Sequence, residues 1–136
     1  MKLHLEIITP DRIAYSEEVD MVIVPGVMGT LGILPKHIPL FAQLTEGELK
    51  IKRGSEDFFL SIGGGFVEVT KTKVSILVTR AVNSQELNES EIIKAKTEAI
   101  EALKRKPEGQ DLSLARAMLR QSLVDMKVLR RRRRTH

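Results

Sequence analysis

The sequence of 136 residues contains no cysteine and no tryptophan, and only 4% of its residues are aromatic. The absence of cysteine excludes disulfides and thiolate metal sites, and it fits a reducing compartment. With so few aromatic side chains, a base-stacking surface for nucleic acid is not expected. At 42% hydrophobic and 29% charged residues, the composition is that of an ordinary globular protein.

Long hydrophobic runs are also missing. No apolar stretch approaches the roughly 20 residues that a membrane-spanning helix needs. The first residues, MKLHLEIITP, alternate between apolar and polar side chains and are interrupted at Pro10, so we expect no signal peptide. Any association with a membrane is therefore expected to come through a partner.

The net charge of +4 is unevenly distributed along the chain. Residues 1–84 hold 9 basic and 10 acidic side chains, whereas residues 85–136 hold 13 basic and 8 acidic ones. The basic character therefore belongs to the C-terminal part.

Residues 1–84 read as strands. Leu3, Leu5 and Ile7 alternate with polar neighbours, which is the period of two that buries one face of a strand. Five short β-rich runs follow, separated by glycine or charged turns: MVIVP, ELKIKR, DFFLSI, GFVEV and KVSILVT. Many short strands without an intervening helix predict an antiparallel β-sandwich or barrel.

Residues 85–136 change to the helical period. Asn88, with Glu91 three residues later, has the spacing of a capping box. An apolar stripe then predicts a first helix, whose members are Ile92, Ala95, Ala99 and Ala102. Lys104 to Lys106 place cations at its C-terminus, and Pro107 and Gly109 are expected to end it.

A second helix is expected after a short turn, with Asp111 as its cap. Its stripe consists of Leu112, Ala115, Leu119, Ser122, Met126 and Leu129. The two helices should form an antiparallel hairpin. Because alanine buries little apolar area, the hairpin is expected to be only marginally stable, free to dock on the β domain or to leave it. The sequence thus predicts an α+β protein in two parts, a β domain of residues 1–84 and a helical hairpin of residues 85–136.

The segment PGVMGTLGILPKHIPLFAQL combines three evenly spaced glycines with prolines, a histidine and many aliphatic residues. Gly26, Gly29 and Gly32 lack the Lys-Ser/Thr pair of a phosphate-binding loop, and no helix start follows them. We interpret them as turn glycines. Val27 and Met28, between the first two, are expected to form an exposed apolar patch that docks on a partner.

Catalysis or metal binding by His37 is not favoured. His4 lies on the N-terminal strand and His136 at the end of the chain, so neither is a local partner for His37. No Ser-His-Asp order is suggested either. A hydrogen-bonding or interface role for His37 is the expectation, and no metal site is predicted.

Five consecutive arginines, Arg130–Arg134, form the strongest electrostatic feature of the sequence. The simplest interpretation is a solvated helix end. An arginine-rich tail also suits a small basic RNA-binding protein, because clustered cations release counterions from phosphate. An acidic protein surface is an equally suitable target.

The motifs resemble those of the epsilon subunit of F-type ATP synthase. PGVMGTLGILPKHIPL, followed by LTEGELKI and by GGGFVEV before KVSIL, is similar to the family pattern, and the helical hairpin agrees in length and order. The resemblance implies a non-catalytic rotor subunit of the central stalk, which couples ring rotation to ATP synthesis. It implies the gamma subunit and the c-ring as partners, membrane attachment only through the complex, and a position on the cytoplasmic face of a bacterial inner membrane.

The resemblance also implies contact residues. The c-ring would be contacted by the turn segment: Gly26, Val27, Met28, Gly29, Thr30 and Leu31. The gamma subunit would be contacted by the residues that follow: Pro35, His37, Pro39 and Leu40. In the family, the hairpin can extend and restrain ATP hydrolysis. Here an acidic loop of a catalytic β subunit would be met by Arg116, Arg120, Arg130, Arg131, Arg132, Arg133 and Arg134.

Some bacterial members of the family bind ATP at the hairpin through a motif with an Asp and an Arg. In the gapless match Asn88 replaces that Asp and Glu91 replaces that Arg, whereas Arg116 and Arg120 match basic positions of the site. No cofactor is expected, and ATP remains a possible regulatory ligand at Asn88, Glu91, Arg116 and Arg120.

Overall fold

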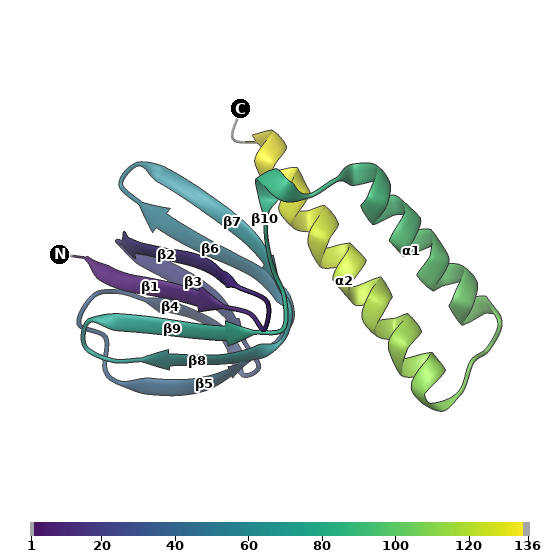
Figure 1. The fold of residues 1–136 in the computed structure, drawn as a ribbon, viewed down its shortest axis with the longest axis horizontal. Helices are drawn as coiled ribbons and strands as arrows, with labels where there is room; N and C mark the ends of the chain where they lie inside the picture. Colours follow the sequence, from purple (N-terminus) through teal and green to yellow (C-terminus); the bar gives the residue numbers. More distant parts are fainter. Residues whose placement is uncertain (1, 135–136) are drawn as a thin grey trace. The chain divides into compact units, whose positions relative to one another are not determined.

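The computed structural model describes residues 2–134 (Figure 1). Side chains are described for residues 2–131. The chain forms two compact units, one ending at Asn83 and the other beginning at Ser84. The first unit consists of β1 (Leu3–Ile8), β2 (Ile13–Val19), β3 (Met21–Gly26), β4 (Gly29–Ile33), β5 (Leu40–Leu44), β6 (Gly47–Arg53), β7 (Glu56–Ile62), β8 (Gly65–Val69), β9 (Lys73–Val78) and β10 (Ala81–Asn83). The second consists of a 3-10 turn η1 (Ser84–Glu86), α1 (Glu89–Lys104) and α2 (Gly109–Arg134).

The ten strands of the first unit form one strongly curled sheet. Its order is β10-β7-β6-β3-β5-β8-β9-β1-β2, and β4 pairs with β3. The outer strand β2 comes back towards β6, where the Arg53 guanidinium lies 3.5 Å from the Tyr15 hydroxyl. The predicted β-sandwich or barrel is therefore confirmed.

One strand pair departs from the predicted antiparallel pattern. β1 and β9 are parallel, with Leu5 opposite Val74 and Ile7 opposite Ile76. Antiparallel neighbours arise from short hairpins, whereas β1 and β9 are separated by most of the domain. No tight turn joins them, so nothing in the chain imposes opposite directions on the two strands.

The core of the β domain confirms the alternation read from the sequence. Strand β1 alternates between buried and half-buried positions, and Leu5 and Ile7 are fully buried. Each such side chain contributes about 1.5–3 kcal/mol when it leaves water. The inward faces of the other strands complete one contiguous core, which includes Val22, Leu49, Ile51, Ile62, Val67 and Ile76.

Four strands were not predicted: β2, β4, β5 and β10. Strand β2 has only one buried residue, Val19, so its sequence carries little hydrophobic alternation. Strands β4 and β5 lie in the glycine- and proline-rich segment, where two glycines weaken the strand signal of β4. Strand β10 is only three residues long.

The second unit is the predicted antiparallel hairpin. Ile92 and Ala99 of α1 are buried, as are Ala115, Ser122 and Leu129 of α2. The prediction that Asp111 caps α2 is wrong, because the helix begins two residues earlier, at Gly109. Asp111 lies in the first turn instead, where a negative charge is favourable beside the free N–H groups. Gly109, expected to end the first helix, has a positive φ of 60° and opens the second.

The cap of α1 is the predicted one. The Asn88 side-chain oxygen accepts hydrogen bonds from the Glu91 backbone N–H at 3.1 Å and from the Ser90 hydroxyl at 2.8 Å. We expect Asn88→Ala to destabilise the hairpin by about 1 kcal/mol, because a helix donor loses its acceptor. Hydrogen exchange at the Glu91 amide measures the effect. Asn88→Asp keeps the acceptor and should exchange like the wild type; equal exchange in the alanine variant would contradict the prediction.

Candidate functional site

The turn between β3 and β4 carries the most exposed apolar residue of the described side chains. Gly26 pairs with Gly29, and Val27 and Met28 form the two-residue tip. A Cβ at Gly26 would lie 2.5 Å from the Gly29 carbonyl oxygen, and Gly29 has a φ of 131°. The interpretation as turn glycines is therefore confirmed at both positions, but it is wrong for Gly32, which lies within β4 opposite Ile23. Met28 is 99% exposed and Val27 is half exposed, so the tip offers an apolar surface to solvent.

A surface hollow of about 510 Å³, which we name the turn hollow, lies beside this tip. The backbone N–H of Val27 donates to the Gln43 carbonyl at 2.9 Å and fixes the tip against β5. The hollow is lined by two segments, residues 26–31 and residues 40–43. All six residues expected to contact the c-ring thus line one concavity.

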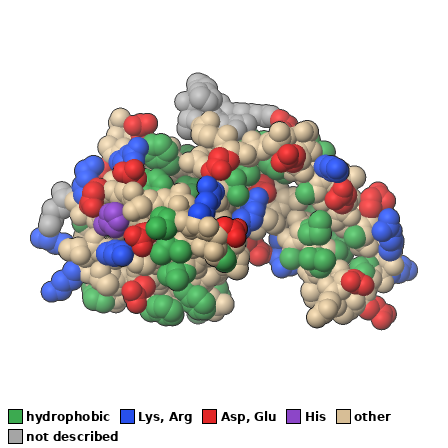
Figure 2. All heavy atoms as spheres, in the orientation of Figure 1, with side chains coloured by type: hydrophobic (Ala, Val, Ile, Leu, Met, Phe, Trp, Pro, Cys, Tyr) green, Lys and Arg blue, Asp and Glu red, His purple; other side chains and the backbone are tan. Residues whose placement is uncertain are grey.

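An exposed apolar row continues from the turn hollow across β5, β8 and β9. Phe41 and Phe66 stack with ring centroids 5.5 Å apart, and Leu77 lies opposite Phe66 in the strand register. Figure 2 shows hydrophobic side chains gathered over these strands. The sequence interpretation missed this row. The run SILV in β9 could have predicted it, because this run places apolar side chains on both faces of the strand. Such a pattern is typical of a strand that is covered on both faces.

A second hollow, of about 540 Å³, is lined by three lysines, which gives it the name lysine hollow. Its other walls come from residues 35–39 of the β4–β5 loop and from Thr72. Pro35, His37 and Pro39, expected to contact gamma, all line it, whereas Leu40 lines the turn hollow instead. The consecutive residues Pro39 and Leu40 therefore line different hollows.

His37 is held by its own loop. Its backbone N–H donates to the Leu34 carbonyl at 3.2 Å, and ring atom Nδ1 lies 2.7 Å from the Ile38 carbonyl oxygen. This contact agrees with the expected hydrogen-bonding role. Beside it, Ile38 is 78% exposed, so the loop also presents an apolar side chain.

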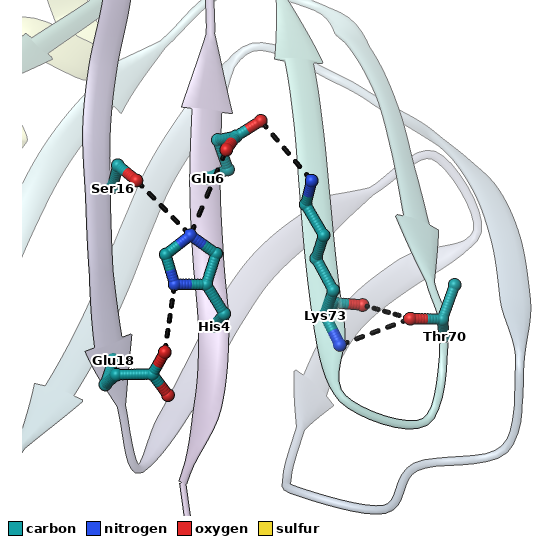
Figure 3. A network of polar contacts seen from close by, with 6 residues as sticks. All are labelled: His4, Glu6, Ser16, Glu18, Thr70 and Lys73. Atoms are coloured by element: carbon teal, nitrogen blue, oxygen red, sulfur yellow. Dashed lines mark hydrogen bonds and ion pairs between the residues drawn. The ribbon is translucent and has the colours of Figure 1, made fainter.

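His4 belongs to a separate polar network on the outer face of β1, β2 and β9 (Figure 3). Its Nδ1 lies 3.1 Å from Glu18 Oε1, and Nε2 lies 3.3 Å from the Ser16 hydroxyl. Glu6 also bridges to Lys73 at 3.6 Å. Within residues 2–134, no group of three or more His, Cys, Asp or Glu side chains is arranged to hold a metal ion. The hydrogen bonds and ion pairs of His4 and Glu6 thus link β1 to β2 and to β9 on the surface of the sheet.

Lys2 is the one lysine of the lysine hollow with an ion-pair partner in the described structure. Its Nζ lies 3.6 Å from Asp20 Oδ1. The pKa of Asp20 is lowered, first because its other oxygen accepts a 2.6 Å hydrogen bond from the Gly54 N–H, and also because Lys2 is near. The Asp20 carboxylate is therefore held ionised beside the lysine hollow.

The exposed face of α2 is basic. Arg116, Arg120 and Arg130 are exposed and Arg131 is half-buried. After Asp111 in its first turn, α2 has one further acidic residue, Asp125. The Asp125 side chain is buried and accepts a hydrogen bond from Gln121 at 3.3 Å. The helix continues through Arg134, but the side chains of Arg132, Arg133 and Arg134 lie outside those described.

Of the four residues considered for ATP, Glu91 and Arg120 lie within about 3 Å of each other along the hairpin axis, whereas Asn88 and Arg116 lie further apart. Asn88 uses its side chain as the helix cap. It precedes α1, whose 16 residues span about 24 Å, whereas Arg116 lies about 10 Å along α2 from the turn that joins the helices. Because the helices are antiparallel, Asn88 and Arg116 are about 14 Å apart along the hairpin axis. ATP binding stays a prediction.

No helix within residues 2–134 is long and apolar enough to cross a membrane. A curled β domain with two surface hollows, followed by a basic helical hairpin, is typical of a small protein that binds other proteins. Residues 2–84 match the family described as "ATP synthase, Delta/Epsilon chain, beta-sandwich domain".

The curated relatives extend the match over the whole length. The ATP synthase epsilon chain of Dehalococcoides mccartyi strain BAV1 is 42% identical over 134 residues, covering 97% of this chain and 95% of its own. That of Herpetosiphon aurantiacus is 38% identical and covers 98% of both chains. The chain therefore belongs to the epsilon chain family of ATP synthase, a subunit of a membrane-associated complex.

Solved structures agree in fold. A chain from the Euglena gracilis mitochondrial ATP synthase, solved with OSCP, F1 and the c-ring, superposes with a TM-score of 0.70 at 23% identity. It covers 95% of this chain, and 78% of the Euglena chain is matched. A chain from the central stalk and c-ring structure of the Tetrahymena thermophila enzyme has a TM-score of 0.62 at 18% identity, with 95% and 97% covered.

Proposed function

We propose that this chain is a non-catalytic rotor subunit of the ATP synthase central stalk, which couples rotation of the c-ring to ATP synthesis. The observation that carries the proposal is the pair of hollows on the β domain. The turn hollow, with its exposed Met28, suits docking on the c-ring. The loop of residues 35–39 suits docking on the gamma subunit.

The site has the form of an interface. The turn hollow is lined mainly by apolar side chains and backbone, and the most exposed large apolar residues of the two hollows are Met28, Ile38 and Phe41. Burying such side chains drives protein association. The chain would contribute no active site of its own, and it would lie at the cytoplasmic face of a bacterial inner membrane, attached through the complex.

The helical hairpin is proposed to restrain ATP hydrolysis. Its exposed α2 face carries Arg116, Arg120 and Arg130 without an intervening carboxylate on that face. Such a face is complementary to an acidic loop of a catalytic β subunit, and salt should weaken the contact. The family assignment favours this target over the alternative of RNA.

The turn hollow is tested by a single charge at its tip. Met28→Glu is expected to weaken binding of the chain to the isolated c-ring by about tenfold or more, because a carboxylate would be buried where an apolar side chain docked. Since Met28 is 99% exposed, the thermal midpoint should not change.

Ile13→Glu, at an exposed position of β2, is the matched control and should bind the ring like the wild type. Biolayer interferometry on detergent-solubilised ring measures all three chains. If Met28→Glu binds the ring as tightly as the wild type does, the turn tip does not contact the ring.

A further inference from the structure

The lysine hollow has two kinds of lining residue, apolar ones, which we call its apolar floor, and lysines, which we call its cationic rim. Pro35, Ile38 and Pro39 supply the apolar side chains, and the lysines come from three separate segments of the chain. Lys2 precedes β1, Lys36 lies in the β4–β5 loop and Lys71 lies in the β8–β9 turn. Figure 2 shows Lys and Arg side chains at the end of the β domain where β1 begins.

The segment that carries Lys36 has an unusual backbone. Lys36 has a φ of 65°, in the left-handed region where glycine has no steric cost. A lysine there costs of order 1 kcal/mol, and such strain concentrates at functional positions. Flanking prolines and the 3.2 Å hydrogen bond from His37 N–H to the Leu34 carbonyl hold the loop in this shape.

The turn that carries Lys71 is equally fixed. The Thr70 backbone N–H donates to the Lys73 carbonyl at 2.8 Å, and the Thr70 hydroxyl accepts from the Lys73 N–H at 3.2 Å. The Thr72 carbonyl accepts from the His4 N–H at 2.9 Å, which ties the turn to β1. Both lysines are thus mounted on rigid backbone, which lowers the entropic cost of binding.

The charge on the rim is only partly balanced within the β domain. Lys2 bridges to Asp20 at 3.6 Å. Lys36 and Lys71 form no ion pair with any of the described residues. Two lysines without an ion-pair partner among the described residues therefore line the hollow.

We propose that the lysine hollow receives an acidic segment of the gamma subunit, in which an aliphatic or aromatic side chain fills the floor and carboxylates pair with Lys36 and Lys71. This inference rests on the proposed docking of the β domain on gamma. The unpaired lysines favour a segment that carries carboxylates, because the charges are complementary. The apolar lining favours a segment in which an apolar side chain lies next to those carboxylates.

The concave shape favours a polypeptide over a lipid surface. A hollow of about 540 Å³ accommodates one or two large side chains, whereas a bilayer is approached by protruding apolar groups beside cations. Anionic lipid is therefore the alternative that the experiment has to separate.

The test uses the full chain and a reconstituted α₃β₃γ head. Lys36→Glu with Lys71→Glu should bind the head roughly 30-fold more weakly at low salt, with a smaller difference at high salt. Lys52→Glu with Lys94→Glu makes the same charge change at exposed positions elsewhere and should bind within about threefold of wild type. Lys36→Arg with Lys71→Arg keeps the charge and should restore binding.

Carbodiimide cross-linking locates the carboxylates. The reagent joins a lysine amine to a carboxylate in contact with it as an amide, with net loss of water. The expected product joins Lys36 or Lys71 to an Asp or Glu of gamma, and the arginine variant should not form it.

If the glutamate variant binds the head as the Lys52 and Lys94 control does, the inference is overturned and the proposed function stands. If the unmodified chain does not bind the head, the proposed function fails, and the inference fails with it. Loss of binding to phosphatidylglycerol vesicles in the glutamate variant, without a cross-link to gamma, would overturn the inference in favour of lipid.

Discussion

Neutralising four arginines of α2 is expected to release ATP hydrolysis. A full chain with glutamine at four positions, Arg116, Arg120, Arg130 and Arg131, should lose most of its inhibition of the α₃β₃γ head. Each exposed charge pair contributes modestly, so the four together should weaken the inhibited state by about tenfold or more. Steady-state hydrolysis at increasing chain concentration measures this directly, and high salt should relieve inhibition by the unmodified chain.

Two comparisons separate this electrostatic contact from a general loss of charge. Glutamine at Lys52, Lys94, Lys104 and Lys106 removes the same charge from other surfaces and should leave inhibition unchanged. A chain cut after Leu87 should bind gamma but not inhibit. If the full and cut chains bind gamma equally and neither slows hydrolysis, the hairpin does not inhibit ATP hydrolysis. The subunit then only couples rotation to ATP synthesis.

Gly65→Ala is expected to lower the free energy of unfolding of the β domain by about 3 kcal/mol or more. A Cβ at Gly65 would overlap the Leu77 carbonyl oxygen and lie 2.8 Å from the Val78 Cα. Both are backbone atoms of the neighbouring strand β9, so no side chain can rotate away. Urea unfolding followed by circular dichroism measures the loss.

The adjacent residue supplies the control. A Cβ at Gly64 meets only the Leu44 carbonyl oxygen at 3.5 Å, which is an ordinary contact. Gly64→Ala should therefore change the stability by no more than about 1 kcal/mol. Similar losses in the two variants would show that close approach of β9 is not what requires glycine at position 65.

The elements that could be predicted are those whose own residues carry a period. Strand β1 alternates because one face enters the core, and α1 begins directly after Asn88 because that side chain accepts a helix N–H. The tip at Val27 and Met28 was also predictable, since its flanking glycines require a turn. In each case the cause lies within a few residues of the effect.

The remaining features arise from residues distant in sequence. The lysine hollow brings together Lys2, Lys36 and Lys71, and no local pattern reports that the segments carrying them meet. The row from Phe41 to Leu77 depends on the register of three strands. The parallel pairing of β1 with β9 is likewise invisible to periodicity, which gives a strand's faces but not its neighbours.

That parallel pairing also governs how the β domain can be synthesised. Strand β1 leaves the ribosome first and can pair at once with β2 through a hairpin, but its other edge waits for β9, more than sixty residues later. Until then a strand with buried Leu5 and Ile7 keeps an open edge and an uncovered face. Because long-range pairing is slow to form, we expect closure of the sheet to come late in folding. A nascent chain stalled before Lys73 should therefore depend on chaperones, whereas one released after Asn83 should not.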